Sequence, residues 1–145
     1  MKIRELMTDS VIRIWAEETV EVAARTLSRY NIGVLPVCET DGTLCGLVTD
    51  RDLVTRCLAA NLQPASTSVR QVMTNQVLSV KPDMEVGVAA HLMGRSQVRR
   101  LPVTDNGNLC GMVSLGDLAA REESLMDAAD ALTDISSNIS QRKGW

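Results

Sequence analysis

The sequence is poor in the residues on which several classes of function depend. Aromatic residues make up 2% of the 145 residues and phenylalanine is absent, so stacking platforms for nucleic-acid bases are missing. The lone histidine, His91, is too little for a histidine-based metal site. The formal net charge is -3, which does not favour binding to nucleic acid or to an anionic membrane surface.

Long apolar segments are also missing. No apolar run approaches the roughly 20 residues that a membrane-spanning helix needs. The N-terminus, Met1–Leu6, carries charged residues and lacks the apolar stretch of a secretory signal. We therefore expect a cytoplasmic protein with no membrane partner, and the alternation of strand and helix patterns along the chain predicts the α/β (α+β) class. The 45% hydrophobic and 23% charged content is ordinary for such a chain.

The sequence contains an internal duplication. A displacement of 66 residues, which becomes 65 after a turn, aligns many pairs of identical residues within the first 121 positions. Such self-similarity indicates two copies of one structural unit. Identical pairs include Arg4/Arg70, Met7/Met73, Val20/Val86, Ala23/Ala89, Leu35-Pro36-Val37/Leu101-Pro102-Val103, Gly46/Gly111 and Asp52/Asp117.

Each copy predicts the order β-α-β-β-α. In the first copy a β-branched run at 11–14 precedes an amphipathic helix from Val20, and a hairpin turns at Asp41-Gly42 before a second helix near Asp50. One copy alone has too few strands to bury its sheet, so we expect the two copies to pack sheet against sheet as a pseudo-twofold pair. The predicted organisation is repeat 1 over 1–60, a linker over 61–68, repeat 2 over 69–121 and a C-terminal helix or tail over 122–145.

Two further patterns are open to interpretation. One stripe of apolar residues predicts a helix that packs either on the core or against a partner. It consists of residues at intervals of seven, with Ile135 beside them: Leu118, Leu125, Leu132 and Ile139.

Four cysteines, with no C-x-x-C pair, are interpreted as reduced core thiols, and no metal site is expected. The repeat register places Cys45 opposite Val37 rather than opposite another cysteine. The four cysteines are Cys38, Cys45, Cys57 and Cys110.

The final hairpin of each copy leads into a shared motif. The first copy has Gly46-Leu47-Val48-Thr49-Asp50-Arg51-Asp52, and the second has Gly111-Met112-Val113-Ser114-Leu115-Gly116-Asp117. A hydroxyl followed three residues later by an acid is typical of a capping box at a helix start. The same acid could instead accept the hydroxyls of a ribose, with phosphate oxygens near the hydroxyl and the backbone N–H groups. Both interpretations can hold together.

These motifs, duplicated and in order, resemble the CBS domain pair, also called the Bateman module. The resemblance covers residues 1 to about 121 and also rests on Leu6-Met7-Thr8, Val72-Met73-Thr74 and 98–103. It implies a homodimer whose clefts between repeats bind an adenosine-containing ligand such as AMP, ADP, ATP or S-adenosylmethionine. The implied ligand residues are Asp52 and Asp117 for ribose, Thr49 and Ser114 beside them, Arg99 and Arg100 for phosphates, and Val11, Val34 and Val77 around adenine.

The two clefts are not expected to be equivalent, because Gly33-Val34 stands where the second copy has Arg99-Arg100. We expect a regulatory module that requires no cofactor and signals to an unknown effector protein in trans. The alternative is a ligand-independent structural or protein-interaction module with empty clefts. An enzyme is not expected, because the sequence offers no nucleophile with a paired base and no phosphate-binding glycine loop.

Overall fold

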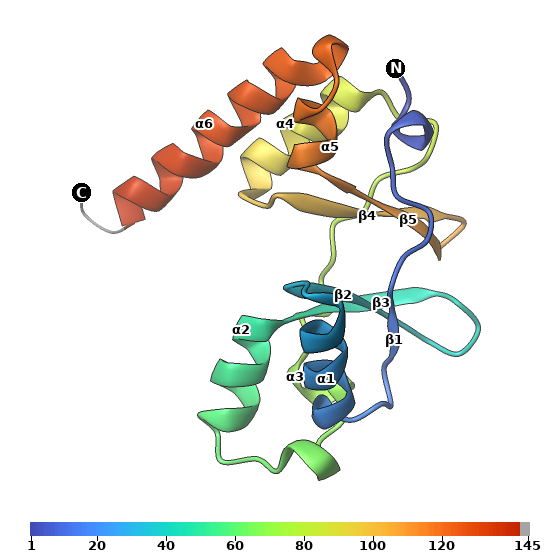
Figure 1. Ribbon diagram of the computed structural model, residues 1–145, viewed down its shortest axis with the longest axis vertical. Helices are drawn as coiled ribbons and strands as arrows, with labels where there is room; N and C mark the ends of the chain where they lie inside the picture. The colour runs from blue at the N-terminus through green and yellow to red at the C-terminus, as the bar shows by residue number, and fades with distance from the viewer. Residues whose placement is uncertain (143–145) are drawn as a thin grey trace. The chain divides into compact units, whose positions relative to one another are not determined.

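The computed structural model describes the backbone of residues 1–142 and the side chains of residues 1–137. The described chain forms two compact units. One unit consists of Ile12–Val77 with Gly107–Leu109, and the other of Met1–Val11, Leu78–Asn106 and the chain from Cys110 onward. In each unit the helices cover one face of the strands (Figure 1).

The unit formed mainly by Ile12–Val77 contains a three-stranded sheet of order β1-β2-β3. Strand β1 (Ile14–Trp15) is parallel to β2 (Val34–Cys38), which is antiparallel to β3 (Leu44–Thr49). Leu35, Val37 and Val48 are fully buried in its core. Its helical segments are α1 (Val20–Tyr30), α2 (Asp50–Leu53), the π-helical turn η2 (Val54–Leu58), η3 (Pro64–Ser66) and α3 (Val69–Val72).

The second unit contains the hairpin of β4 (Arg100–Asp105) and β5 (Asn108–Ser114). Its leading strand is reduced to a single parallel bridge between Val80 and Val103. The pairing stops there because Pro82, two residues later, has no N–H to donate. Its helical segments are η1 (Ile3–Glu5), α4 (Val86–Ser96), α5 (Leu115–Ala119), η4 (Glu122–Ser124) and α6 (Leu125–Arg142).

This element order confirms the duplicated β-α-β-β-α prediction, and the helix and hairpin positions agree with it. The compact units nevertheless differ from the sequence repeats in their leading segments. Ile3, from the start of the first repeat, is buried in the core around β4 and β5. Val69 and Val72, from the start of the second repeat, are buried in the core around β2 and β3. Each core therefore combines residues from both repeats.

The C-terminal helix α6 packs against α4 and α5 of its own unit (Figure 1). The residues that it buries are Ala128, Ala131 and Ile135. Of the two predicted alternatives, packing on the core is therefore correct, and Ile135 beside the heptad stripe is buried, but Leu125 and Leu132 of the stripe remain 49% and 43% exposed. Small alanines allow the helix axes to approach closely, which leaves the larger leucines at the edge of the contact. The side chain of Ile139 lies outside the described residues.

Candidate functional site

Both sequence motifs form capping boxes at the start of a short helix. In the first, the Asp52 N–H donates to Thr49 Oγ1 at 3.0 Å and Asp52 Oδ2 accepts from the Thr49 N–H at 3.0 Å. In the second, the corresponding distances between Asp117 and Ser114 are 3.1 and 2.8 Å. The structure thus confirms the capping interpretation for both motifs. One oxygen of each carboxylate is used in this way, and the other can make a further contact, as Asp52 Oδ1 does with Arg56 Nε at 3.8 Å.

The backbone brings each motif beside the start of the preceding hairpin. The Leu115 N–H donates to the Arg99 carbonyl at 2.8 Å, and the Asp50 N–H donates to the Gly33 carbonyl at 3.1 Å. Arg99 and Arg100 therefore lie next to Ser114. Both arginine side chains are exposed, so their guanidinium groups are free of the cost of burying an unpaired charge.

A pocket of about 530 Å³ lies at this junction. Arg99, Arg100 and Ser114 line it from the strand ends, and Leu125, Ala128 and Leu132 are among the α6 residues that line it. Two guanidinium groups and a hydroxyl favour an anion, while the leucines and alanines favour an apolar group. Asp117, the expected ribose ligand, follows Gly116 of the pocket lining in the sequence, but Asp117 itself is not one of the lining residues.

The matched positions of the first repeat have a different charge. Gly33 and Val34 replace the two arginines, and Asp50 stands where the pocket has Leu115. Asp52 also has a cationic neighbour, because Arg56 Nε lies 3.8 Å from its Oδ1. A carboxylate in place of an apolar residue, with no arginine pair at 33–34, disfavours a phosphate there because like charges repel. The two motif sites are therefore chemically distinct.

The three valines expected around an adenine are all half-buried, in different parts of the fold. Val34 begins β2 and pairs with Thr49 in the sheet, so it lies directly beside the first motif. Val77 belongs to the same unit as Val34, whereas Val11 belongs to the unit that holds Arg99, Arg100, Ser114 and Asp117. Each unit thus contains one motif and at least one of these valines.

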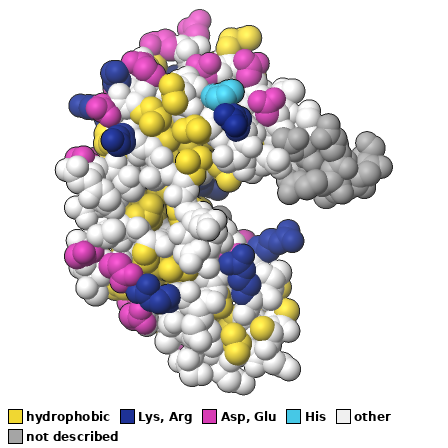
Figure 2. Space-filling model, turned by 180° about the vertical axis from the view of Figure 1, so that it is seen from behind, with side chains coloured by type: hydrophobic (Ala, Val, Ile, Leu, Met, Phe, Trp, Pro, Cys, Tyr) yellow, Lys and Arg dark blue, Asp and Glu magenta, His cyan; other side chains and the backbone are white. Residues whose placement is uncertain are grey.

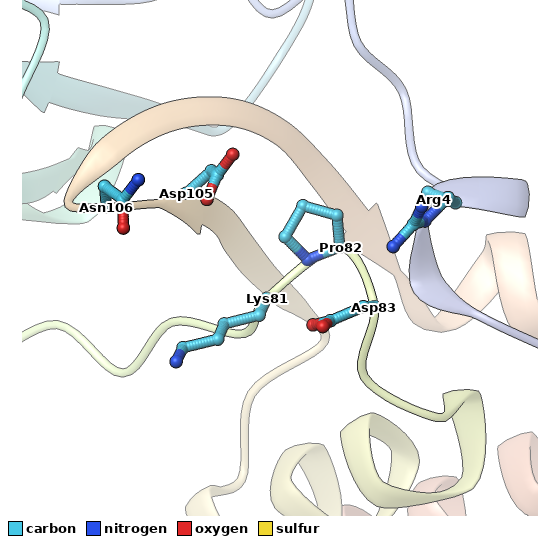
Figure 3. A pocket seen from close by; sticks show the side chains of 6 residues that line it. All are labelled: Arg4, Lys81, Pro82, Asp83, Asp105 and Asn106. Carbon is cyan, nitrogen blue, oxygen red and sulfur yellow. The ribbon is translucent and has the colours of Figure 1, made fainter.

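Sequence reasoning missed the contribution of α6 to the pocket. Its alanine spacing, Ala128, Ala131 and then Ile135, was the available signal. It also missed a second, polar pocket of about 410 Å³. Figure 3 shows Arg4 from η1, the loop Lys81–Asp83, and Asp105 and Asn106 at the end of β4 around this pocket. Its mixed charges favour no single ligand class.

The cysteines form no site. All four are free thiols, and Cys45 Sγ donates to the Val37 carbonyl at 3.4 Å. The predicted register was one residue off, because the ladder pairs Val37 with Gly46 and is irregular between Val37 and Cys38. Burial raises the pKa of Cys45 to about 11, with a smaller contribution from the charge of Glu39. Burial likewise raises the pKa of Cys38 and Cys110. Thiols with raised pKa values are poor nucleophiles and poor metal ligands at neutral pH.

Two further observations concern metals and membranes. Among residues 1–137, no three His, Cys, Asp or Glu side chains are grouped so that they could hold a metal ion. No helix in the described chain has both the length and the apolar character of a membrane span. Figure 2 shows Lys and Arg interspersed with Asp and Glu over much of one face, which is unlike a continuous basic nucleic-acid interface.

Comparison with known proteins agrees with the fold. The CBS domain family matches residues 3–59 and 69–124. The chain is 41% identical to the protein YlbB of Bacillus subtilis over 145 residues, covering 99% of this chain and 97% of that protein. Among solved structures, Hypoxic Response Protein I with two coordinated zinc ions aligns with a TM-score of 0.77, 31% identity and coverage of 83% of this chain and 98% of that one. CBSX2 in complex with AMP aligns with a TM-score of 0.75 and 25% identity over 86% of this chain and 98% of that one. The chain therefore belongs to the CBS domain family and carries two CBS domains in tandem.

Proposed function

We propose that this protein is a regulatory module that binds an adenosine-containing nucleotide, with AMP as the first candidate. The observation that carries the proposal is the pocket lined by Arg99, Arg100 and Ser114. Two exposed guanidinium groups provide charge-assisted hydrogen bonds for a phosphate. The AMP complex of the related CBSX2 supports the choice of ligand. ADP, ATP and S-adenosylmethionine are the other ligands to test.

In this proposal Asp117 binds the ribose. Its Oδ2 accepts the Ser114 N–H at 2.8 Å, which fixes the carboxylate and leaves the second oxygen for the ribose hydroxyls. Val11 belongs to the same unit and contributes an apolar contact for adenine. The site at Thr49 and Asp52, with Val34 and Val77, is the weaker one because it lacks the arginine pair.

The proposed mechanism is a shift between conformations of the module. A ligand changes the balance only by as much as it binds one conformation more tightly than the other. An effector protein then recognises the favoured conformation in trans. No catalytic role is proposed, since the raised thiol pKa values and the use of both hydroxyls as helix caps leave no activated nucleophile at the motifs.

Calorimetric titration with AMP tests the proposal. We expect wild-type protein to bind, Arg99→Gln and Asp117→Asn to bind at least about tenfold more weakly, and Asp52→Asn to bind as wild type. Asparagine keeps an oxygen that accepts the capping N–H, so Asp117→Asn changes the charge and preserves the fold. No heat with AMP, and no rise in melting temperature at millimolar AMP, would reject nucleotide binding.

One observation favours a second candidate, a ligand-independent structural module. Both motifs are already fully explained as capping boxes, which stabilise a helix start by roughly 1 kcal/mol without any ligand. In this case Asp117→Asn and Asp52→Asn have equal and small effects on stability, and neither AMP nor S-adenosylmethionine binds.

We also propose a homodimer, as the family resemblance implies. Val54 and Leu58 of η2 are exposed apolar side chains, and a second copy of this chain would bury them. Sedimentation velocity tests this surface. We expect wild-type dimers, and a shift toward monomers for Leu58→Gln but not for Met126→Gln, an exposed apolar residue on α6. Monomeric wild-type protein would contradict the proposal.

A further inference from the structure

We propose that α6 is part of the ligand site and is the element that responds to the ligand. This inference rests on the proposed function and assigns the regulation of that same pocket. The family match ends at residue 124, and α6 begins at Leu125, so the helix is an addition to the two CBS domains. Because α6 lies outside the matched domains and lines the pocket beside Ser114, a ligand in that pocket can alter how firmly α6 is docked.

One wall of the pocket comes from α6. Leu125, Ala128, Ala129 and Leu132 recur at intervals of about one helical turn and line the pocket together with Arg99 and Arg100. Leu125 and Leu132 are each nearly half exposed, so apolar surface is available to a ligand. The lining holds no carboxylate, since the other members are Ser114, Leu115, Gly116 and Ala119.

This chemistry selects a class of ligand. The pocket suits an anion that also carries a flat apolar group, with the charge at the arginines and the apolar group on the leucines. A nucleoside monophosphate has this character. A bare inorganic anion would leave the leucines uncovered, and a neutral apolar molecule would leave the guanidinium groups without a partner.

The attachment of α6 allows a ligand to influence it. At its start, the Ser124 hydroxyl donates to the Leu118 carbonyl at 2.6 Å, which joins α6 to α5. Along its length α6 meets α4 through small side chains, including Gly94, where an added Cβ would lie 3.4 Å from Ala131 Cα. Contacts between small side chains bury little apolar area per residue, so they hold α6 on α4 only weakly. A ligand that touches both the arginines and α6 adds apolar contacts of its own and favours the conformation in which α6 packs on α4.

The experiment compares variants within α6. Leu132→Gln and Ala129→Gln change the pocket wall, while Met126→Gln changes a residue of the same helix that is 73% exposed and lies outside the pocket. Calorimetry with AMP and hydrogen exchange of α6 amides with and without AMP are the two measurements. We expect each wall variant to weaken AMP binding at least about fivefold, and AMP to slow α6 exchange in wild type and in Met126→Gln.

A second probe separates this inference from the proposed function. 1-Anilinonaphthalene-8-sulfonate is an anion with a flat apolar group, and its fluorescence should rise with wild type and Met126→Gln but less with Leu132→Gln and Arg99→Gln. If AMP fails to bind while this difference holds, the nucleotide proposal fails and the α6 pocket stands. If AMP binds equally to all variants and leaves α6 exchange unchanged, the α6 inference is overturned and the nucleotide proposal stands. Equal dye signals in all variants would also overturn the α6 inference.

Discussion

Helices α1 and α4 occupy the same place in the two repeats and have the same length of 11 residues, but their outer faces differ. Ala24 on α1 is exposed, whereas the matching Ala90 on α4 is only 3% exposed because α6 covers it. The helix faces diverge at two positions in particular. Gly87 and Gly94 of α4 correspond to Glu21 and Ser28 of α1. The duplicated core thus tolerates different outer surfaces, and one of them accepts an extra helix.

The ionic cluster near the leading segment shows the same divergence. Arg70 Nε lies 2.6 Å from Glu17 Oε1 and its NH2 lies 2.7 Å from Glu39 Oε1. The matching residues in the unit of β4 and β5 are Arg4, Asp83 and Asp105, and among the described residues Arg4 forms no ion pair. Aspartate is one methylene shorter than glutamate. Shortening both acids opens the cluster, and the polar pocket of Figure 3 lies at the position that the Arg70 ion pairs close in the unit of β2 and β3.

The largest expected effect tests what the repeats share. A Cβ at Gly46 would lie 2.8 Å from the Thr74 carbonyl oxygen, and one at Gly111 would lie 3.0 Å from the Thr8 carbonyl oxygen. These carbonyl oxygens are backbone atoms of the leading segments, one from each repeat. Moving either oxygen would displace the leading segment that packs on that core. We expect Gly46→Ala and Gly111→Ala to lower the free energy of unfolding by about 2–3 kcal/mol, with Gly46→Ala the more severe. Chemical denaturation measures both.

Gly116→Ala is the matched control, because its nearest neighbour is Ser114 Oγ at 3.6 Å. Alanine within helix α5 should leave stability unchanged or raise it slightly. Equal stability of all three variants would show that the close approach of the leading segments is not needed, and the two cores would then be less alike than their geometry indicates.

The next effect tests where the repeats differ. Gly94→Leu places a side chain against Asp134 and Ala131 and should separate α6 from α4, lowering the free energy of unfolding by about 1–2 kcal/mol. Ser28→Leu makes the same change at the exposed, matching position of α1 and should leave the free energy of unfolding almost unchanged. Limited proteolysis should cut α6 faster in Gly94→Leu only. Equal behaviour of the two variants would mean that α6 does not depend on the glycine.

A smaller effect is expected at the ionic cluster. Arg70→Ala removes hydrogen bonds to two carboxylates, while Arg4→Ala removes none of this kind. The Arg70 side chain is partly solvated, so we expect only a small fall in melting temperature, and we expect added salt to reduce it. Arg4→Ala should have no effect at any salt concentration. A larger fall for Arg4→Ala would show that the polar pocket is held together by contacts other than ion pairs.

The repeat explains how much could be predicted from the sequence. Identical residues such as Gly46/Gly111 and Asp52/Asp117 mark positions that the backbone constrains, so the element order and both capping boxes were predictable. A C-terminal helix packed on the core was one of two predicted alternatives, but the face that α6 buries was not predicted, because the leucines recur every seven residues while the buried residues are two alanines and Ile135. Pairing of the leading segments with the opposite core was also hidden, since a sequence repeat does not say which copy receives its first residues. The pocket at Arg99 and Arg100 depends on the first of these features, because α6 residues form part of its lining.

The smallest expected effect concerns the paired thiols Cys45 and Cys110, which occupy the same position in the two hairpins. Both donate to the carbonyl across the hairpin at 3.4 Å, and burial raises the pKa of both. For Cys45 the pKa is raised from 9.0 to about 11, so its thiolate is a minor species at pH 8 and alkylation by iodoacetamide should be slow and should accelerate up to about pH 11.

Because the folded thiol keeps its proton above the pH at which the unfolded thiol loses it, this residue's contribution to stability is complete below pH 9 and declines as the pH rises toward 11. Glu39→Gln should accelerate alkylation of Cys45 but not of Cys110, because Glu39 raises the pKa of Cys45 and of the buried Cys38. Asp105→Asn should accelerate alkylation of Cys110 but not of Cys45, because Asp105 raises the pKa of Cys110. Site-resolved mass spectrometry measures both rates, and a change at the wrong cysteine would show that the two hairpins are coupled electrostatically.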